Sequence, residues 1–172
     1  NHELAAVTLL VYQTIIDPSQ FEKNILIINK LNYCLYDIEE QLIFLEFLFW
    51  LYSSVVNKQN NARSIISVMR SLLTKDLPIE FQILPDNMTA ILKANEGQQK
   101  ALTVAYEASL INLKGKSNRF KKILWDYLIH LCNTNEYEKI EKNLPLLKSE
   151  YEPTQAKRRY DYILLLLDIS KS

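Results

Sequence analysis

The chain has 172 residues, with 20 Lys and Arg against 20 Asp and Glu, and 48% of its residues are hydrophobic. This composition is typical of a compact globular domain and excludes wholesale disorder. The balanced charge gives no electrostatic basis for binding DNA or RNA, because phosphate binding needs clustered cations. With only two Gly and five Pro, helices are favoured over strands joined by tight turns.

Two amphipathic helices are predicted at the start of the chain, over residues 3–16 and 21–31, from apolar residues at helical spacing. Asp17 and Gln20 lie between these helices, three residues apart, and form a candidate capping box for the second helix. The sequence therefore predicts a helical hairpin here.

Residues 42–56 are the most apolar stretch of the chain, and Glu46 is their only charged residue. A helix that is apolar on every face is either a buried helix or a membrane span. At about 15 residues the stretch is shorter than the roughly 20 that a bilayer requires. We therefore predict a central helix over residues 37–56, buried in the protein and capped by Asp37 with Glu40.

The rest of the chain also predicts helices, over residues 62–74, 88–93, 98–113, 120–132, 137–148 and 154–169. Pro85 either kinks one helix or separates two short ones, and Pro145 either bends its helix or belongs to its end. Gly115 is expected to end the helix before it as part of a C-cap.

Polar residues interrupt the helical pattern at intervals of about 38–40 residues, a period typical of helical-hairpin repeats; these residues are Asp17, Asn57, Asn95 and Asn133. A hairpin cannot bury its apolar face alone, so neighbouring hairpins stack. We therefore predict an all-α fold, an α-solenoid of about four helical hairpins followed by the first helix of a fifth. It is expected to form a single helical-repeat domain over residues 1–172.

The last unit carries apolar residues at fixed positions on two successive helices, followed by Pro153; they are Leu124, Tyr127, Leu128 and Leu131, then Tyr137, Ile140, Leu144 and Leu147. This set resembles the tetratricopeptide repeat over residues 120–153 and only faintly before them. Leu128 and Ile140 stand where that repeat has small residues, so another type of α-solenoid fits the same pattern.

The resemblance implies that the first helix of each hairpin lines a concave groove that holds a peptide. Aligned in this way, the groove residues are Phe49, Ser53 and Asn57 (with Glu46) in the second hairpin and Lys122, Trp125, Ile129 and Asn133 in the last one. The alternatives are that Phe49 and Trp125 belong to the core, and that Asn57 and Asn133 are helix C-terminal caps.

Few residues are candidates for catalysis, metal binding or phosphate binding. His130 and Cys132 are two residues apart on one helix and point to different faces, which does not favour a Cys–His nucleophile. Cys34 and Cys132 are too far apart for a disulfide framework or a metal site. Gly97 and Gly115 stand alone, so no phosphate-binding loop is indicated. We predict no enzymatic activity, no metal and no cofactor.

The basic run that ends at Lys122 is interpreted as a solvated helix start rather than a nucleic-acid contact. Residues 160–169 are apolar but too few to cross a bilayer, so a core helix is preferred. We therefore expect no direct nucleic-acid binding by this fragment and no membrane association. The two cysteines are interpreted as reduced thiols of a cytoplasmic protein.

The sequence therefore predicts a non-catalytic helical-repeat module that binds a protein or peptide partner. The pattern is also similar to the sensor portions of bacterial transcriptional regulators, which join such repeats to a separate DNA-binding domain. Asn1 stands in place of Met, so we expect a fragment of a longer protein. The alternative is a structural scaffold or oligomerisation subunit, in which residues 160–169 pair with a neighbour, for example in a homodimer.

Overall fold

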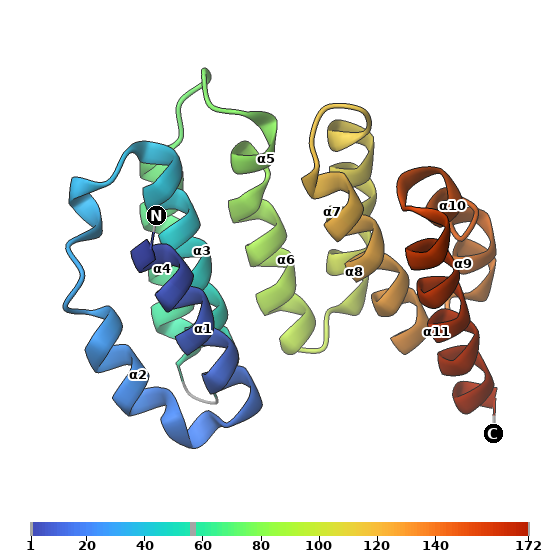
Figure 1. Ribbon diagram of the computed structural model, residues 1–172, viewed down its shortest axis with the longest axis horizontal. Coiled ribbons are helices and arrows are strands. Elements are labelled where there is room, and N and C mark those ends of the chain that lie inside the picture. Colours follow the sequence, from blue (N-terminus) through green and yellow to red (C-terminus); the bar gives the residue numbers. More distant parts are fainter. Residues whose placement is uncertain (1, 56–57, 172) are drawn as a thin grey trace. The chain divides into compact units, whose positions relative to one another are not determined.

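The fold is seen in a computed structural model, which describes residues 2–55 and 58–171, with side-chain surroundings through residue 168 (Figure 1). Helices and short connections make up the described residues, which contain no strand. The predicted all-α class is therefore confirmed. Within the described part of the chain, no helix combines the length and the apolar content that crossing a bilayer requires.

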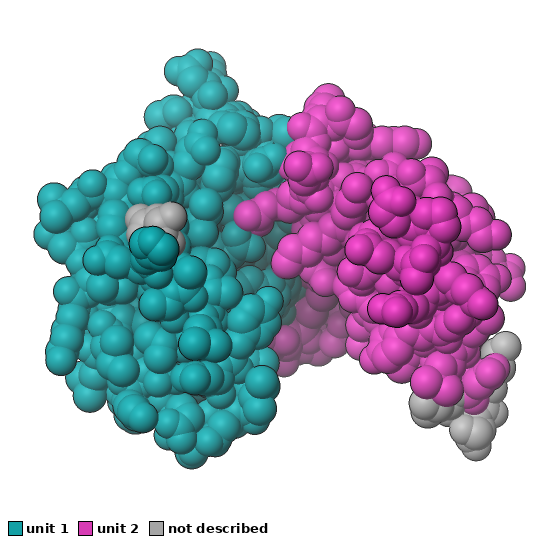
Figure 2. All heavy atoms as spheres, viewed as in Figure 1, with its two compact units in different colours: residues 1–92 teal, residues 93–172 magenta. Residues whose placement is uncertain are grey.

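The chain divides into two compact units, Asn1–Leu92 and Lys93–Ser172 (Figure 2). The sequence predicts one domain over this whole range. No Gly-rich or Pro-rich linker marks the boundary, because the boundary falls inside a helix, α6 (Leu84–Asn95). Composition along the chain therefore gave no sign of the division.

The first unit is organised around α3 (Ile38–Ser53), which packs against α1 (His2–Ile16) and most extensively against α4 (Gln59–Leu72) (Figure 1). Its other elements are two 3₁₀ turns and three further helices: η1 (Pro18–Gln20), α2 (Phe21–Ile28), η2 (Tyr33–Leu35), α5 (Ile79–Gln82) and the first part of α6. α2 is shorter than the predicted helix over residues 21–31.

Of the two predicted caps of the first unit, the one at Asp37 forms as expected, while Asp17 caps the 3₁₀ turn η1 instead of α2. The Asp37 carboxylate accepts a hydrogen bond from the backbone N–H of Glu40 at 2.9 Å, at the start of α3. The Asp17 carboxylate accepts one from the backbone N–H of Ser19 at 3.1 Å, at the start of η1. These bonds satisfy groups that the first turn of a helix otherwise leaves without partners.

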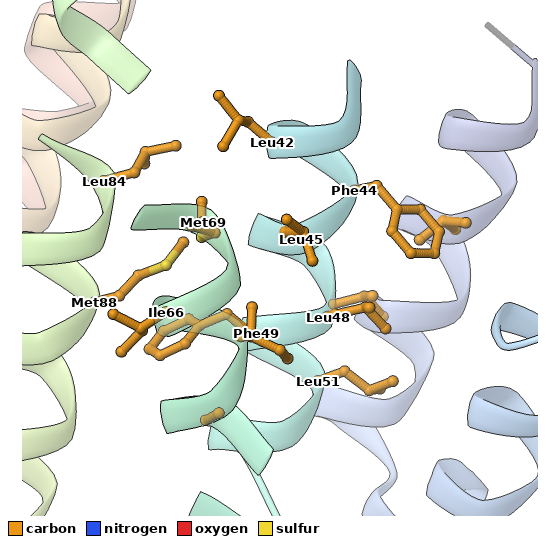
Figure 3. Close-up of a cluster of buried hydrophobic side chains, with 14 of the residues drawn as sticks. Leu42, Phe44, Leu45, Leu48, Phe49, Leu51, Ile66, Met69, Leu84 and Met88 are labelled. Carbon is orange, nitrogen blue, oxygen red and sulfur yellow. The ribbon is translucent and has the colours of Figure 1, made fainter. Parts of the chain in front are cut away.

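The apolar stretch on α3 is buried, as the sequence predicts. Its fully covered side chains meet residues of α4 and α6 in one core (Figure 3): Leu42, Phe44, Leu45, Leu48, Phe49 and Leu51 with Ile66, Met69, Leu84 and Met88. Each such burial contributes roughly 1.5–3 kcal/mol to stability. The helix ends at Ser53, three residues before the predicted end, and Val56 lies outside the described residues.

The two prolines that the sequence could not assign both separate helices. Pro85 is the second residue of α6, where its missing N–H costs little, and α5 ends just before it. Pro145 lies between α9 (Tyr137–Asn143) and α10 (Leu146–Glu150), so the predicted helix over residues 137–148 is two helices.

The second unit contains α7 (Gln99–Leu113), α8 (Arg119–Asn133), α9, α10 and α11 (Pro153–Lys171). α7 packs most extensively on α8, although the predicted repeat frame assigns these helices to neighbouring hairpins. α8 also contacts α9 and α11, and α10 packs on α11. Gly115 follows α7 with φ +70°, the left-handed conformation expected of a helix C-cap.

Candidate functional site

An open cleft of about 700 Å³ lies in the second unit, where α7 begins and α8 ends. This volume falls within the range of ligand-binding clefts. Its walls come from the first turns of α7 and from the chain that passes from α8 into α9: Gln99, Lys100, Thr103 and Val104, then Asn133, Thr134, Glu136 and Lys139.

The end of α8 gives the cleft its second wall, because a Schellman motif reverses the chain there. Asn135 has φ 57°, a left-handed conformation that asparagine tolerates better than most residues. The N–H of Glu136 donates to the carbonyl of Leu131 at 3.0 Å, and that of Asn135 donates to the carbonyl of Cys132 at 3.2 Å. This reversal places the side chain of Glu136 against α7.

The hydroxyl of Thr103 on α7 is hydrogen-bonded to one residue before this turn and to one after it. Its Oγ1 lies 2.9 Å from Nε2 of His130 and donates to Oε1 of Glu136 at 3.1 Å. A hydroxyl has one proton to give, so His130 Nε2 is the donor in the other bond. Thr103 and His130 are only 4% and 7% exposed, and these bonds satisfy polar atoms that would be costly to bury alone.

Ion pairs continue the network along α9 and back to α7. The ammonium of Lys139 lies 2.9 Å from Oε2 of Glu136 and 3.0 Å from Oε1 of Glu107. The hydroxyl of Tyr127 donates to the same oxygen of Glu107 at 2.8 Å. Residues from α7, α8 and α9 are therefore joined in one chain of polar contacts, and three of its members, Thr103, Glu136 and Lys139, line the cleft.

The network fixes the charges of its members near neutral pH. Burial lowers the pKa of His130, which favours the neutral imidazole. The hydrogen bond from Lys139 lowers the pKa of Glu136 against the opposing effect of burial. Burial pushes the pKa of Glu107 upward, but hydrogen bonds from Lys139 and Tyr127 outweigh it and the net shift is downward. Both glutamates are therefore carboxylates.

The geometry of Thr103 and His130 does not match that of a nucleophile and its base. A base must accept the proton of the hydroxyl, whereas Nε2 of His130 donates and the hydroxyl proton points to Glu136. Cys132 is buried and burial raises the pKa of its thiol, while Cys34 is exposed. Among the described residues, no three His, Cys, Asp or Glu side chains are grouped to hold a metal ion.

Of the groove residues that the sequence predicts, Asn133 lines this cleft. It is the last residue of α8 and its side chain is exposed. The sequence offered helix capping as its alternative role. In the structure Thr134 occupies the C-cap position and Asn135 takes the left-handed conformation, so the capping geometry belongs to the two residues that follow.

The other predicted residues of α8 lie away from the cleft. Lys122 is exposed and Ile129 is half-buried. Trp125 is half-buried under α11, where the guanidinium carbon of Arg159 lies 4.6 Å from the centre of its ring. The same guanidinium lies 4.5 Å from the ring of Tyr151, so Arg159 is stacked between two aromatic side chains. Trp125 thus holds α11 in place.

In the first unit, the predicted groove residues that the structure describes are buried or half-buried. Phe49 is 0% exposed and belongs to the core, which is the alternative that the sequence offered (Figure 3). Ser53 is half-buried and its hydroxyl donates to the backbone carbonyl of Trp50 at 3.2 Å. Asn57 lies outside the described residues.

Sequence reasoning missed most of the cleft, including Thr103, Val104 and Glu136. One signal was present. Thr103 and His130 are polar residues on the mainly apolar buried faces of α7 and α8. Two such residues on helices that can pack together indicate a buried polar contact.

Comparisons of the chain with protein-family models, with curated proteins and with solved structures find no match. A functional proposal must therefore start from the residues of the cleft themselves.

Proposed function

We propose that this chain is a non-catalytic module that binds a peptide segment of a protein partner in the cleft between the start of α7 and the end of α8. The observation that supports this proposal is the composition of the cleft wall. Val104 is apolar and 64% exposed, and it lies beside the exposed polar side chains of Lys100 and Asn133. A peptide offers both kinds of group at once, namely backbone amides and side chains.

Each of these residues has a distinct use in such binding. The side-chain amide of Asn133 has a donor and an acceptor, and so it can pair with both the N–H and the C=O of an extended peptide residue. Val104 offers apolar surface to a peptide side chain. Lys100 lies in the first turn of α7, where its charge adds to the positive end of the helix dipole and favours an acidic group of the peptide.

The polar network supports the proposal because it holds the cleft wall in place before a ligand arrives. Thr103, Glu136 and Lys139 are bonded to one another or to neighbouring helices. Binding to a wall that is already ordered costs less conformational entropy than binding to mobile side chains.

The wider setting of the module is also a proposal. We propose that its helix pairs are tetratricopeptide-like repeats of an α-solenoid, supported by the polar breaks at Asp17, Asn95 and Asn133, which fall at helix ends. In a longer protein the module would serve as the sensor portion of a bacterial transcriptional regulator. The full-length sequence tests this, because a domain of another class in place of a DNA-binding domain would overturn it.

Selection from a displayed library of random peptides tests binding directly, with the 172-residue chain as the immobilised target. We expect enriched peptides that share an acidic residue near an apolar one. Their dissociation constants are then measured by titration calorimetry or fluorescence anisotropy against the chain and its variants.

Two variants and two matched controls place the binding site. Asn133→Ala and Val104→Glu should each weaken binding about tenfold or more, the effect of losing one hydrogen-bonding group or an apolar contact. Asn112→Ala and Ile111→Glu make the same changes on exposed residues of α7 that do not line the cleft, and should leave affinity within about twofold. Absence of enriched peptides, or equal affinity for all four variants, would contradict the proposal.

A further inference from the structure

Helix α1 has a second apolar face that its own unit does not cover. Val7, Val11 and Thr14 are buried against the first unit. The opposite side carries four residues that we call the α1 stripe: Ala5, Leu9, Tyr12 and Ile16. The last three are 60%, 61% and 83% exposed. In Figure 1 α1 is the dark-blue helix, and it packs against α3 and α2.

The spacing of the stripe is that of a coiled-coil seam. Its members follow one another at steps of four, three and four residues, which keeps them on one line of a helix that packs on another helix. The positions that flank such a seam usually carry charges that select the partner. In α1 these positions are uncharged: Ala6, Thr8, Gln13 and Ile15.

We propose that the α1 stripe binds the same stripe of a second copy of this chain, as an antiparallel helix pair on a two-fold axis. In a two-fold interface a surface meets itself, so any charge on the surface is placed near an identical charge. The stripe and its flanks contain no charged residue, and the acidic or basic residues of α1, His2 and Glu3, lie in its first turn, before the stripe begins. An uncharged, self-matching seam fits an identical partner.

The sizes of the side chains favour one register. With the axis between Leu9 and Tyr12, Leu9 of one copy lies opposite Tyr12 of the other, and Ala5 lies opposite Ile16. Each layer then pairs a smaller residue with a larger one, and all four stripe residues are covered in both copies. Such alternation lets facing side chains interdigitate.

This dimer is expected to be weak and reversible. A helix of 15 residues is about 22 Å long, and one face of it offers less than the roughly 800 Å² per partner of a standard stable interface. We therefore expect a dissociation constant in the micromolar range or above.

Sedimentation equilibrium of the 172-residue chain, from micromolar to near-millimolar concentration, tests the proposal. We expect a concentration-dependent monomer–dimer equilibrium. Leu9→Lys places like charges near each other in the interface and should raise the dissociation constant at least about 100-fold. Ile111→Lys, the same kind of change at a residue that is 77% exposed in the second unit, should leave it unchanged.

The double variant L9K/Y12E tests the register, because it sets opposite charges across each central layer of the antiparallel pair. It should restore dimerisation to within about tenfold of the unmodified chain, while Tyr12→Glu alone should not. Circular dichroism and thermal melting verify that each variant is folded, and Ile16→Lys near the helix end replaces Leu9→Lys if the latter unfolds α1.

Three results would overturn the proposal. One is a monomer at every concentration, and another is a dimer that Leu9→Lys leaves intact, since the copies would then meet elsewhere. The third is a failure of L9K/Y12E to restore the dimer, which would reject the antiparallel pair. These results are separate from the proposed peptide cleft, which lies in the other unit.

Discussion

The two units of this chain are held together by different interactions. Around α3 the first unit buries apolar side chains, and its buried polar contact is a neutral one, in which the Asn24 amide donates to the Thr14 hydroxyl at 3.0 Å. The second unit also has an apolar core, but α7, α8 and α9 are joined by a buried imidazole, two carboxylates and an ammonium. The ion pairs Lys58–Glu22 and Arg70–Asp86 of the first unit lie at the exposed surface. The first unit therefore depends mainly on shape, and the second also on a partly buried network of charges.

This difference predicts which kind of substitution lowers the stability of each unit most. Removing volume should harm the first unit most, because a close-packed core relaxes only partly around a cavity. Removing one polar partner should harm the second unit, because the group left behind stays buried without its bond. Each unit contains one tryptophan, Trp50 or Trp125, so Trp125→Phe and Trp50→Phe backgrounds report the two units separately.

The largest effect is expected from Phe49→Ala in the first unit. Phe49 is 0% exposed, and removing such a ring costs about 3–5 kcal/mol of unfolding free energy. Denaturant unfolding followed by Trp50 fluorescence in the Trp125→Phe background measures the change. Leu35→Ala, at a residue that is 81% exposed, is the control and should cost less than about 0.5 kcal/mol. A loss below about 1 kcal/mol for Phe49→Ala would argue against a tightly packed core.

A smaller effect is expected from Thr103→Val in the second unit. The change keeps the shape of the side chain but leaves His130 and Glu136 without their shared hydroxyl, which should cost about 1–3 kcal/mol. Unfolding followed by Trp125 fluorescence in the Trp50→Phe background is the measurement. Thr8→Val, which removes only a bond to the carbonyl of Leu4 within α1, serves as the matched control and is followed by Trp50 fluorescence in the Trp125→Phe background. Equal costs at both positions would show that the network adds no stability.

The smallest effect is expected on moderate acidification, and it should be confined to the second unit. The pKa of folded His130 lies below its ordinary 6.5, so its contribution to stability is present above that value and is lost as the pH falls through the folded pKa. The lowered pKa values of Glu136 and Glu107 give a further loss below their ordinary 4.5. Because the glutamates are partly exposed, solvent screening limits their share.

Denaturant midpoints at about pH 7.5 and about pH 5.5 test this expectation. The Trp125 transition should move to lower denaturant at the lower pH, while the Trp50 transition stays in place. The lowered pKa of Asp17 in the first unit, caused by hydrogen bonds from Ser19 and Gln20, lies below this window. A larger shift for Trp50 than for Trp125 would reverse the assignment of charge dependence to the second unit.

The parts of the fold that sequence predicts well are local. The burial of α3 follows from the apolar run itself, and the caps at Asp37 and Gly115 follow from residues within one turn of the helix end. Pro145 could not be assigned, since a proline within a helical pattern is compatible with a bend or an end, and packing decides between them.

The candidate site was mostly out of reach because it depends on contacts between distant residues. Thr103 and Glu136 are 33 positions apart, and they meet only because Asn135 reverses the chain after α8. Asn133 lies at a helix end, as the spacing of the polar breaks predicts, and it lines the cleft. Trp125 was placed in a groove because the alignment could not show that α11 covers it.

The chain has one exposed and one buried thiol, so the reaction of the exposed thiol can serve as an internal reference for the rate at which the buried one reacts. A thiol reagent reaches the exposed Cys34 without any opening of the structure, whereas the buried Cys132 must wait until α8 separates from its neighbours. Modification of Cys34 therefore gives the total amount of protein that the reagent can reach. The rate at which Cys132 is modified reports how often the second unit opens. Mass spectrometry of the singly and doubly modified forms would yield that opening rate under native conditions, with neither denaturant nor an added label site.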